Sequence, residues 1–341
     1  MSVQFGLFLT NQHPVGTDQV QALKEQIRVV HAARDQGWDM LWAGQHFLAE
    51  AMTHIQPLAY LARLAPETGA MRVGIGINLL SLLNPVEVAE NYAALDVVLE
   101  GRLIYGVGLG YRDKEYQAFG FSKKGQVHRL EENLRIVTEL WSGMEVHADL
   151  PWCQLDGASL TFLPVQRPRP EIWMAANSNA AVERAARLSD AWMINPHATT
   201  ETVLRQIKLF NAAANACGRS DVTTLPLMRE VFCAPTREEA IRLAAPYLSA
   251  KYQVYAQWGQ DKVMPDKDDF AAAYEQLSEQ RFVVGSPEDV IAELAPWRAI
   301  GVNQFIIRTH WIGMPIESTL QSVRLISDHV MPALRAVDRS G

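Results

Sequence analysis

The feature that most constrains the fold of this chain is a repeated alternation of short apolar runs with amphipathic segments. The first run, "VQFGLFL", is bounded by polar residues, which is typical of a buried parallel strand. The next segment places Val20, Leu23, Ile27 and Val30 on one helical face. Eight strands that alternate with helices favour an α/β fold, the (β/α)8 TIM barrel, over a doubly wound sheet. The predicted strands span residues 3–9, 39–43, 72–80, 103–108, 171–176, 191–195, 225–234 and 304–309.

Capping signals mark where several helices begin. Asn84 followed by Pro85 is a cap followed by proline at the first helical position. Thr236 stands three residues before Glu239, and Ser286 repeats this capping pattern. The predicted helices begin at or near residues 18, 57, 85, 129, 180, 202, 236, 286 and 317.

The length of the chain requires insertions between these units. A typical barrel of this kind needs about 250 residues, and the chain has 341. We place the surplus after the fourth strand at residues 110–127, before the fifth at 143–170 and after the seventh at 250–281. No repeat or clear linker divides the chain, so we expect one domain over residues 1–341.

Charge and composition argue against several classes of partner. The formal net charge is −7 and no run of Lys or Arg stands out, so neither nucleic acid nor an anionic membrane is expected as the main partner. The N-terminus lacks signal-peptide features, and no apolar run approaches the roughly 20 residues that span a bilayer. Cys153, Cys217 and Cys233 lack CxxC spacing, and we interpret them as reduced thiols of a cytoplasmic protein.

The stretch "LIYGVGLGYRDKE" looks at first like a dinucleotide-binding loop. Its glycines follow GxGxG rather than GxGxxG spacing, they come after the fourth strand, and a charged loop stands where a helix should begin. The sequence therefore does not predict a Rossmann site. We interpret Gly106, Gly108 and Gly110 either as bends or as places where a backbone or a flat ligand approaches the fourth strand.

Polar residues follow most of the predicted strands, at the end of a barrel where active sites lie. His46 follows the second strand, either as an ordinary strand-end histidine or as a catalytic group. Ser178 follows the fifth strand and caps a helix, whose free N–H groups can also bind an anion. No carboxylate at ligand spacing accompanies the strand-end histidines, so no metal site is predicted. These histidines are His13, His46, His197 and His310.

Four segments carry a family resemblance: "GWDMLWAGQHFLAE", "NPVEVAENYAALDVVLEGRLIYGVGLGYRDKEYQAFGF", "HRLEENLRI" and "AANSNAAVERAARLSDAWMI". Together and in this order they resemble the bacterial luciferase-like flavin monooxygenases. The similarity extends more loosely to the end of the chain. It implies a barrel that binds FMN, usually as a homodimer.

The resemblance implies roles for residues at the strand ends. His46 matches the catalytic histidine after the second strand of the luciferase alpha subunit, where it would act as a general acid or base. Ser178 matches a serine that binds the FMN phosphate at the start of a helix. Ala176 and Asn177 would lie along the flavin ring or the ribityl chain.

The resemblance also implies further cofactor contacts. The phosphate arginine of the family falls at His128 or Arg129, depending on the placement of one gap. Gly76-Ile77 matches a β-bulge, often with a cis peptide bond, that backs the flavin ring, and Asn78 follows it. Gly108 would line the flavin pocket as part of the GVGLG strand.

Two departures separate the chain from true luciferases. Leu109 replaces a phosphate-binding arginine of the luciferase alpha subunit, and Gly108 replaces a cysteine near the flavin. The resemblance therefore does not extend to light emission or to a long-chain aldehyde substrate.

The activity that the resemblance implies is that of a two-component monooxygenase. Reduced FMN, supplied by a separate NAD(P)H-dependent flavin reductase, and oxygen would be used to oxygenate a small, hydrophobic organic substrate. Residues 250–281 match the mobile loop of the family in position and would form a lid. The predicted walls of the substrate pocket are Phe8, Tyr111, His310 and Trp311.

Two alternatives remain open at the level of sequence. The same barrel family includes hydride-transfer enzymes that use a deazaflavin coenzyme, and Gly76-Ile77 would suit either cofactor. A non-catalytic flavin-binding subunit is the other alternative, against which the presence of His46 argues.

Overall fold

A parallel sheet of nine strands forms the centre of the molecule in the computed structural model, which describes residues 3–219, 222–266 and 268–336. The strand order is β10-β9-β6-β5-β3-β1-β13-β11-β12, and the predicted α/β class is confirmed. The strands are β1 (Gln4–Leu9), β3 (Met40–Ala43), β5 (Arg72–Asn78), β6 (Leu103–Val107), β9 (Glu171–Ala175), β10 (Ala191–Met193), β11 (Pro226–Cys233), β12 (Phe282–Gly285) and β13 (Gln304–Arg308).

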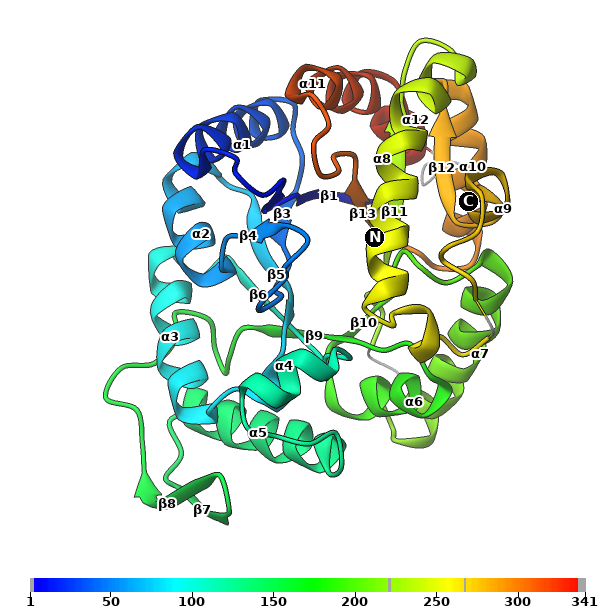
Figure 1. Cartoon of the computed structure of the whole chain (residues 1–341). Coiled ribbons are helices and arrows are strands. Elements are labelled where there is room, and N and C mark those ends of the chain that lie inside the picture. Colours follow the sequence, from blue (N-terminus) through cyan, green and yellow to red (C-terminus); the bar gives the residue numbers. More distant parts are fainter. Residues whose placement is uncertain (1–2, 220–221, 267, 337–341) are drawn as a thin grey trace.

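The sheet curls until β10 meets β11. Ile194, just beyond β10, forms a parallel bridge with Leu227 of β11. The Ile194 N–H donates to the Pro226 carbonyl at 3.1 Å, and the Ile194 carbonyl accepts from the Met228 N–H at 2.9 Å. The strands expected from the sequence thus follow one another in chain order, and Figure 1 shows the helices arranged outside them. Strand β12, which the sequence analysis did not predict, pairs with the second half of β11.

Most helices begin where the capping signals place them. The Asn84 side chain accepts hydrogen bonds from two N–H groups of the first turn, and Ser286 forms a capping box with Asp289. The helix predicted over 317–334 contains a π-helical turn at Ile326–Val330. The helices are α1 (Gln19–Asp35), α2 (Pro57–Leu64), α3 (Pro85–Val98), α5 (Gln126–Trp141), α6 (Asn179–Leu188), α7 (Thr200–Ala216), α8 (Arg237–Gln257), α10 (Pro287–Ala299), α11 (Ile316–Leu325) and α12 (Met331–Ala336).

The segments predicted as insertions contain small elements of their own. Residues 110–127 include the helix α4 (Asp113–Ala118). Residues 143–170 include an antiparallel hairpin, β7 (Val146–Leu150) with β8 (Cys153–Ala158), which projects from the molecule at the lower left of Figure 1. Residues 250–257 continue helix α8 rather than a loop, and a short helix α9 (Tyr274–Ser278) follows.

Large side chains fill the space inside the strands. The rings of Trp42 and Trp173 lie 4.7 Å apart between centroids, and Met40, Ile104 and Ile306 are completely buried with them. The interior is therefore a packed core over much of its depth, and open space is left only toward the carboxyl ends of the strands.

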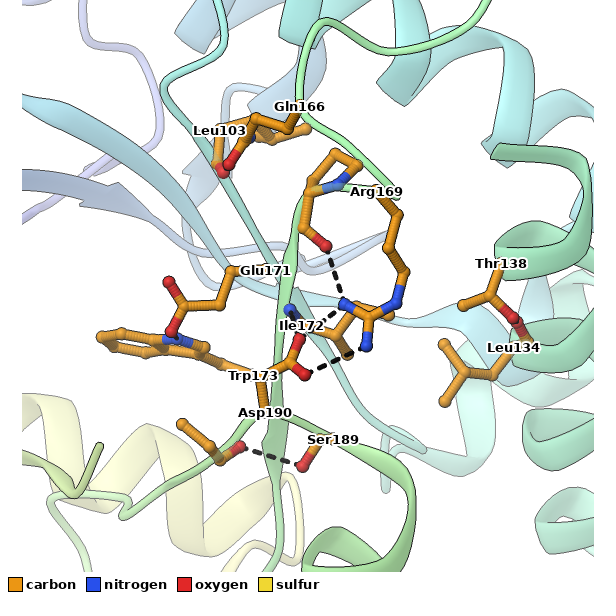
Figure 2. A network of polar contacts seen from close by, with 12 residues as sticks. Leu103, Leu134, Thr138, Gln166, Arg169, Glu171, Ile172, Trp173, Ser189 and Asp190 are labelled. Atoms are coloured by element: carbon orange, nitrogen blue, oxygen red, sulfur yellow. Dashed lines mark hydrogen bonds and ion pairs between the residues drawn. The ribbon is translucent and has the colours of Figure 1, made fainter. Parts of the chain in front are cut away.

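A polar network joins the amino ends of β9 and β10, as Figure 2 shows. The Arg169 guanidinium donates to both carboxylate oxygens of Asp190, at 2.5 and 3.0 Å. Asp190 also accepts from the Ile172 N–H at 2.7 Å, and Glu171 accepts from the Trp173 indole at 2.7 Å. Although burial opposes the charge, the Arg169 bond lowers the pKa of Asp190. This network lies at the opposite end of the strands from the open space.

Gly106 in β6 and Gly108 just after it serve the packing of β6 against β5. A Cβ atom on Gly106 would lie 1.9 Å from the Ile75 carbonyl oxygen, and one on Gly108 would lie 2.2 Å from Cδ1 of Ile77. The register between the two strands shifts between Ile75 and Asn78, and the peptide bond Gly76–Ile77 is cis, as the resemblance implied. Of the two interpretations of Gly106, the close approach of a backbone is the one observed.

Within residues 3–219, 222–266 and 268–336, no helix combines the length and the apolar character needed to cross a membrane.

We expect Gly106→Ala to destabilise the protein by about 3 kcal/mol, because the added methyl group meets a backbone carbonyl that cannot move aside. Urea denaturation measures this free energy of unfolding. Gly44→Ala is the matched control, since a Cβ atom there would approach its nearest neighbours only to 3.4 Å. Equal stability of the two variants would contradict this account of the β5–β6 contact.

Candidate active site

A cavity of about 510 Å³ opens at the carboxyl ends of the strands. Its wall includes Phe8 near the end of β1, Gly76 and Ile77 from β5, and Arg308, the last residue of β13. Segments that follow β3, β6, β9 and β10 form another part of the wall, and residues of β11, α8 and the segment after α8 also contribute. This is where the sequence analysis expected an active site.

The cavity brings together eight of the residues that the sequence analysis selected. His46 and Ser178 line the same cavity as Gly76 and several other residues that were predicted to contact the flavin. Asn78, Gly108, His128, Arg129, His310 and Trp311 are not part of the lining. The predicted residues that line the cavity are Phe8, His46, Gly76, Ile77, Tyr111, Ala176, Asn177 and Ser178.

Arg129 and its neighbours point away from the cavity. The Arg129 guanidinium donates to the carbonyls of Ser81 at 2.7 Å and Ser122 at 3.2 Å and lies 3.9 Å above the Phe121 ring. The His128 ring packs edge-on against Trp152. The two predicted phosphate contacts therefore lie outside the site, because this part of α5 supports the loops behind the cavity wall.

Asn78 is buried behind the same wall. Its amide donates to Gln45 and Tyr92, and its oxygen accepts from the Tyr105 hydroxyl at 2.8 Å. Both ends of the side chain are therefore used in holding β5 against its neighbours.

His310 and Trp311 are buried on the far side of the wall. One ring nitrogen of His310 lies 3.1 Å from the Met314 carbonyl, and burial lowers the pKa of the ring to about 4. The Trp311 indole donates to Glu230 at 2.6 Å. Of the four residues predicted for the pocket wall, Phe8 and Tyr111 line the cavity, whereas His310 and Trp311 are held by internal bonds.

A buried carboxylate holds His46. Glu115, at 0% exposure, places Oε1 3.2 Å from His46 Nδ1 and accepts from the Phe47 N–H at 2.9 Å and from Arg112 at 3.2 Å. Burial opposes its charge, but the bond to His46 and the other donors lower the pKa of Glu115. An ionised carboxylate can only accept, so Nδ1 of His46 carries a proton and Nε2 is the nitrogen left to react.

Aromatic rings surround His46. Trp258 lies 5.0 Å from it between centroids, with Tyr111 at 5.9 Å and Tyr255 at 6.3 Å. Trp258 in turn stacks on Tyr255 and carries the Arg112 guanidinium 4.1 Å above its ring. The segment that follows α8 thus packs directly against the histidine and limits its contact with water.

The start of helix α6 faces the cavity. Ser178 caps this helix by accepting from the Ala181 N–H at 3.3 Å, and both residues line the cavity. The first N–H groups of a helix bind anions. Gln126 lines the same cavity with a buried side-chain oxygen that has no partner among the described residues.

A second histidine lies close to His46. His54, on the short strand β4 (Thr53–His54), lines the cavity, and its Nε2 is buried without a partner in the described part of the chain. Burial, with a smaller contribution from His46, lowers the pKa of His54 to about 3. His54 is therefore neutral at physiological pH.

An ion pair lies behind the cavity. The Lys251 ammonium contacts Oε1 of Glu230, whose Oε2 accepts from Trp311. Burial and the charge of Arg308 lower the pKa of Lys251 to about 7, against the opposing effect of Glu230. Burial opposes the charge of Glu230, but Lys251 and Arg308 lower its pKa. Both oxygens of Glu230 are thus occupied.

Several functional residues were not selected from the sequence. Glu115 stands in "YRDKE" shortly after the fourth predicted strand, and this position alone could have marked it. Arg308 ends the eighth predicted strand and could have been marked in the same way. Trp258 and Gln126 gave no comparable signal, because their approach to the cavity depends on how the loops fold.

The family model described as luciferase-like monooxygenase matches residues 3–304. The chain is 26% identical over 331 residues to the oxygenase component of a flavin-dependent trigonelline monooxygenase from Acinetobacter baylyi, covering 92% of this chain and 91% of that protein.

Solved structures share the fold. The oxygenating constituent of 3,6-diketocamphane monooxygenase from Pseudomonas putida, in complex with FMN, superposes with a TM-score of 0.81 at 21% identity and covers 97% of this chain and 99% of that chain. An F420-dependent secondary alcohol dehydrogenase has a TM-score of 0.78 at 17% identity and covers 98% and 99%. At these identities the likeness shows the fold and not the reaction.

We expect the stability of the protein to fall as the pH decreases from about 6.5 to about 3, in part because His54 binds a proton only when unfolded in this window. His54→Asn should make the dependence shallower, by up to about 1.4 kcal/mol per pH unit. Urea denaturation at several pH values measures the slope. His329→Asn, at an exposed position, is the control. Identical slopes for both variants would contradict the assignment.

Proposed function

The chain belongs to the luciferase-like monooxygenase family and is a flavin-dependent oxidoreductase, and we propose that it is the oxygenase component of a two-component system. In this proposal it takes reduced FMN from a separate NAD(P)H-dependent reductase and uses oxygen to oxygenate a small organic substrate. In this proposal the chain is a single-domain (β/α)8 barrel, which the bridge between Ile194 and Leu227 supports, and it would work in the cytoplasm as a homodimer.

The observation that carries the proposal is the joint arrangement of three features around one cavity: the start of α6 at Ser178, the Gly76–Ile77 peptide and the ring of His46. The first N–H groups of α6 would hold the FMN phosphate. Gly76 and Ile77 would lie against the flavin ring, with Ala176 and Asn177 along its side chain. Gln126, which also lines this cavity, would donate from its side-chain amide to the phosphate in place of the arginine expected at His128 or Arg129.

Bound in its reduced form, FMN would supply the electrons that activate oxygen. The part of the protein in this reaction is proton handling and the exclusion of water. His46 would exchange a proton at Nε2, while Glu115 holds Nδ1–H and stabilises the imidazolium. Trp258 and the residues up to Met264 would cover the site, a smaller lid than the predicted 250–281, because 250–257 belong to α8.

The test of this function is an anaerobic titration of the protein with reduced FMN and with reduced F420, followed by mixing with labelled oxygen and a panel of small organic molecules. The proposal predicts binding of reduced FMN and one labelled oxygen atom in a product. Binding of F420 without a reaction with oxygen would support the hydride-transfer alternative instead. Binding of FMN with no product would support a non-catalytic subunit.

We expect Ser178→Asp to weaken FMN binding by about tenfold or more, because it adds a negative charge beside the phosphate while keeping a side chain that caps the helix. Riboflavin, which lacks the phosphate, should bind both proteins equally. Ser178→Asn, a cap without charge, is the control. Fluorescence titration measures the dissociation constants, and an unchanged value for FMN would place the phosphate elsewhere.

We expect Glu115→Gln to lower turnover by about 100-fold, because a neutral amide no longer supplies a counter-charge to the protonated ring of His46. FMN binding should change by less than about twofold, since Glu115 acts through His46. The control is Asp113→Asn, which changes an exposed acid on the same helix. Wild-type turnover in Glu115→Gln would refute a positioning role.

A further inference from the structure

The guanidinium of Arg308 lines the cavity and makes no hydrogen bond with the described residues. Arg308 is 8% exposed and lines the cavity, and its buried Nε has no partner among the described residues. Its neighbour is an aromatic ring: Cζ lies 4.2 Å from the centroid of Phe8. A buried cation is costly unless an anion pairs with it, so this group is placed to receive one.

The nearby protein carboxylate does not serve this purpose. Both oxygens of Glu230 are taken, one by Lys251 and the other by Trp311. Burial lowers the pKa values of His54 and His197, and the positive charge of Arg308 lowers each of them further. The groups around the guanidinium are thus neutral or positive, apart from a carboxylate that is already paired.

The whole cavity shows the same imbalance. Neither Asp nor Glu occurs among the described residues that line it, whereas Arg308 and Lys262 do. The chain as a whole carries a formal charge of −7, so the positive cavity is a local property and not a consequence of composition.

The FMN phosphate does not account for Arg308. The phosphate would lie at the start of α6, directly after β9, while Arg308 ends β13. Between these two strands stand β6, β5, β3 and β1 in one direction around the sheet and β10 and β11 in the other. Arg308 and Ser178 therefore approach the cavity from opposite sides.

We propose that Arg308 binds the carboxylate of a small organic acid, which is the substrate of this enzyme. The inference rests on the proposed function for the word substrate, but the carboxylate site itself does not. A planar guanidinium with its donors free matches a carboxylate through two parallel hydrogen bonds. Phe8, Met193 and Met228 line the cavity with it and would contact the apolar body of the acid.

The test uses benzoate as the acid probe and benzamide as its neutral counterpart. Isothermal titration calorimetry on the flavin-free protein and on the FMN-loaded protein measures both affinities. We expect benzoate to bind more tightly than benzamide to the wild type, and Arg308→Gln to lose about thirtyfold or more of benzoate affinity while benzamide affinity is retained. Arg308→Lys should keep part of the benzoate affinity, because lysine keeps the positive charge but cannot form the two parallel hydrogen bonds of a guanidinium.

Two controls complete the design. Lys262→Gln removes an exposed cation at the cavity and should leave the preference for benzoate intact. The dissociation constant of FMN should change by less than about threefold in Arg308→Gln.

The proposal is overturned if the wild type does not prefer benzoate, or if Arg308→Gln loses FMN and keeps benzoate, which would make Arg308 a flavin ligand. Failure of the proposed function would give a different experimental result from failure of the carboxylate site. In that case the flavin-free protein would bind benzoate through Arg308 although reduced FMN fails to bind or to react.

Discussion

The backbone of β6 approaches β5 so closely at Gly106 that no side chain fits between them. This contact accompanies the shift in register after Ile75 and leaves the Gly76–Ile77 peptide as part of the cavity wall. It also fixes where the chain leaves β6. The next residues lead to Arg112 and Glu115, and the carboxylate of Glu115 reaches back to the segment after β3 and holds His46. The close contact between β6 and β5 thus adjoins both the part of the cavity wall formed by Gly76 and Ile77 and the segment that carries Glu115, which holds His46.

Buried charges divide into two kinds around the cavity. Glu115 and Glu230 each have several partners, so their charges are compensated within the protein. Arg308 lies against the Phe8 ring, and its buried Nε has no hydrogen-bond partner in the described part of the chain. The first kind stabilises the arrangement of loops and strands, whereas the second would pair with the carboxylate of a ligand in our proposal.

The alternation of strands and helices could be predicted from the sequence because each apolar run and each cap is a local signal. The cavity-lining positions of His46 and Ser178 could be predicted because both directly follow a strand. Strand β12 was missed because its run "FVVG" is short and directly precedes the capping signal at Ser286.

The remaining differences between the predicted and the observed site concern the direction of side chains that lie beyond the end of a strand. Arg129 and Trp311 lie at the expected places along the chain, but their side chains bind carbonyls and a carboxylate outside the cavity. Gly108 lies against Ile77 rather than against the cavity. Such outcomes depend on partners far away in the sequence, which no local pattern contains.

A crystal structure of the protein with FMN bound would decide whether this cavity is a flavin site. The arrangement described above predicts the phosphate on the first N–H groups of α6 beside Ser178, the ring against Gly76 and Ile77, and Arg308 free to contact a second molecule. A phosphate bound to Arg308, or a flavin outside the cavity, would contradict it.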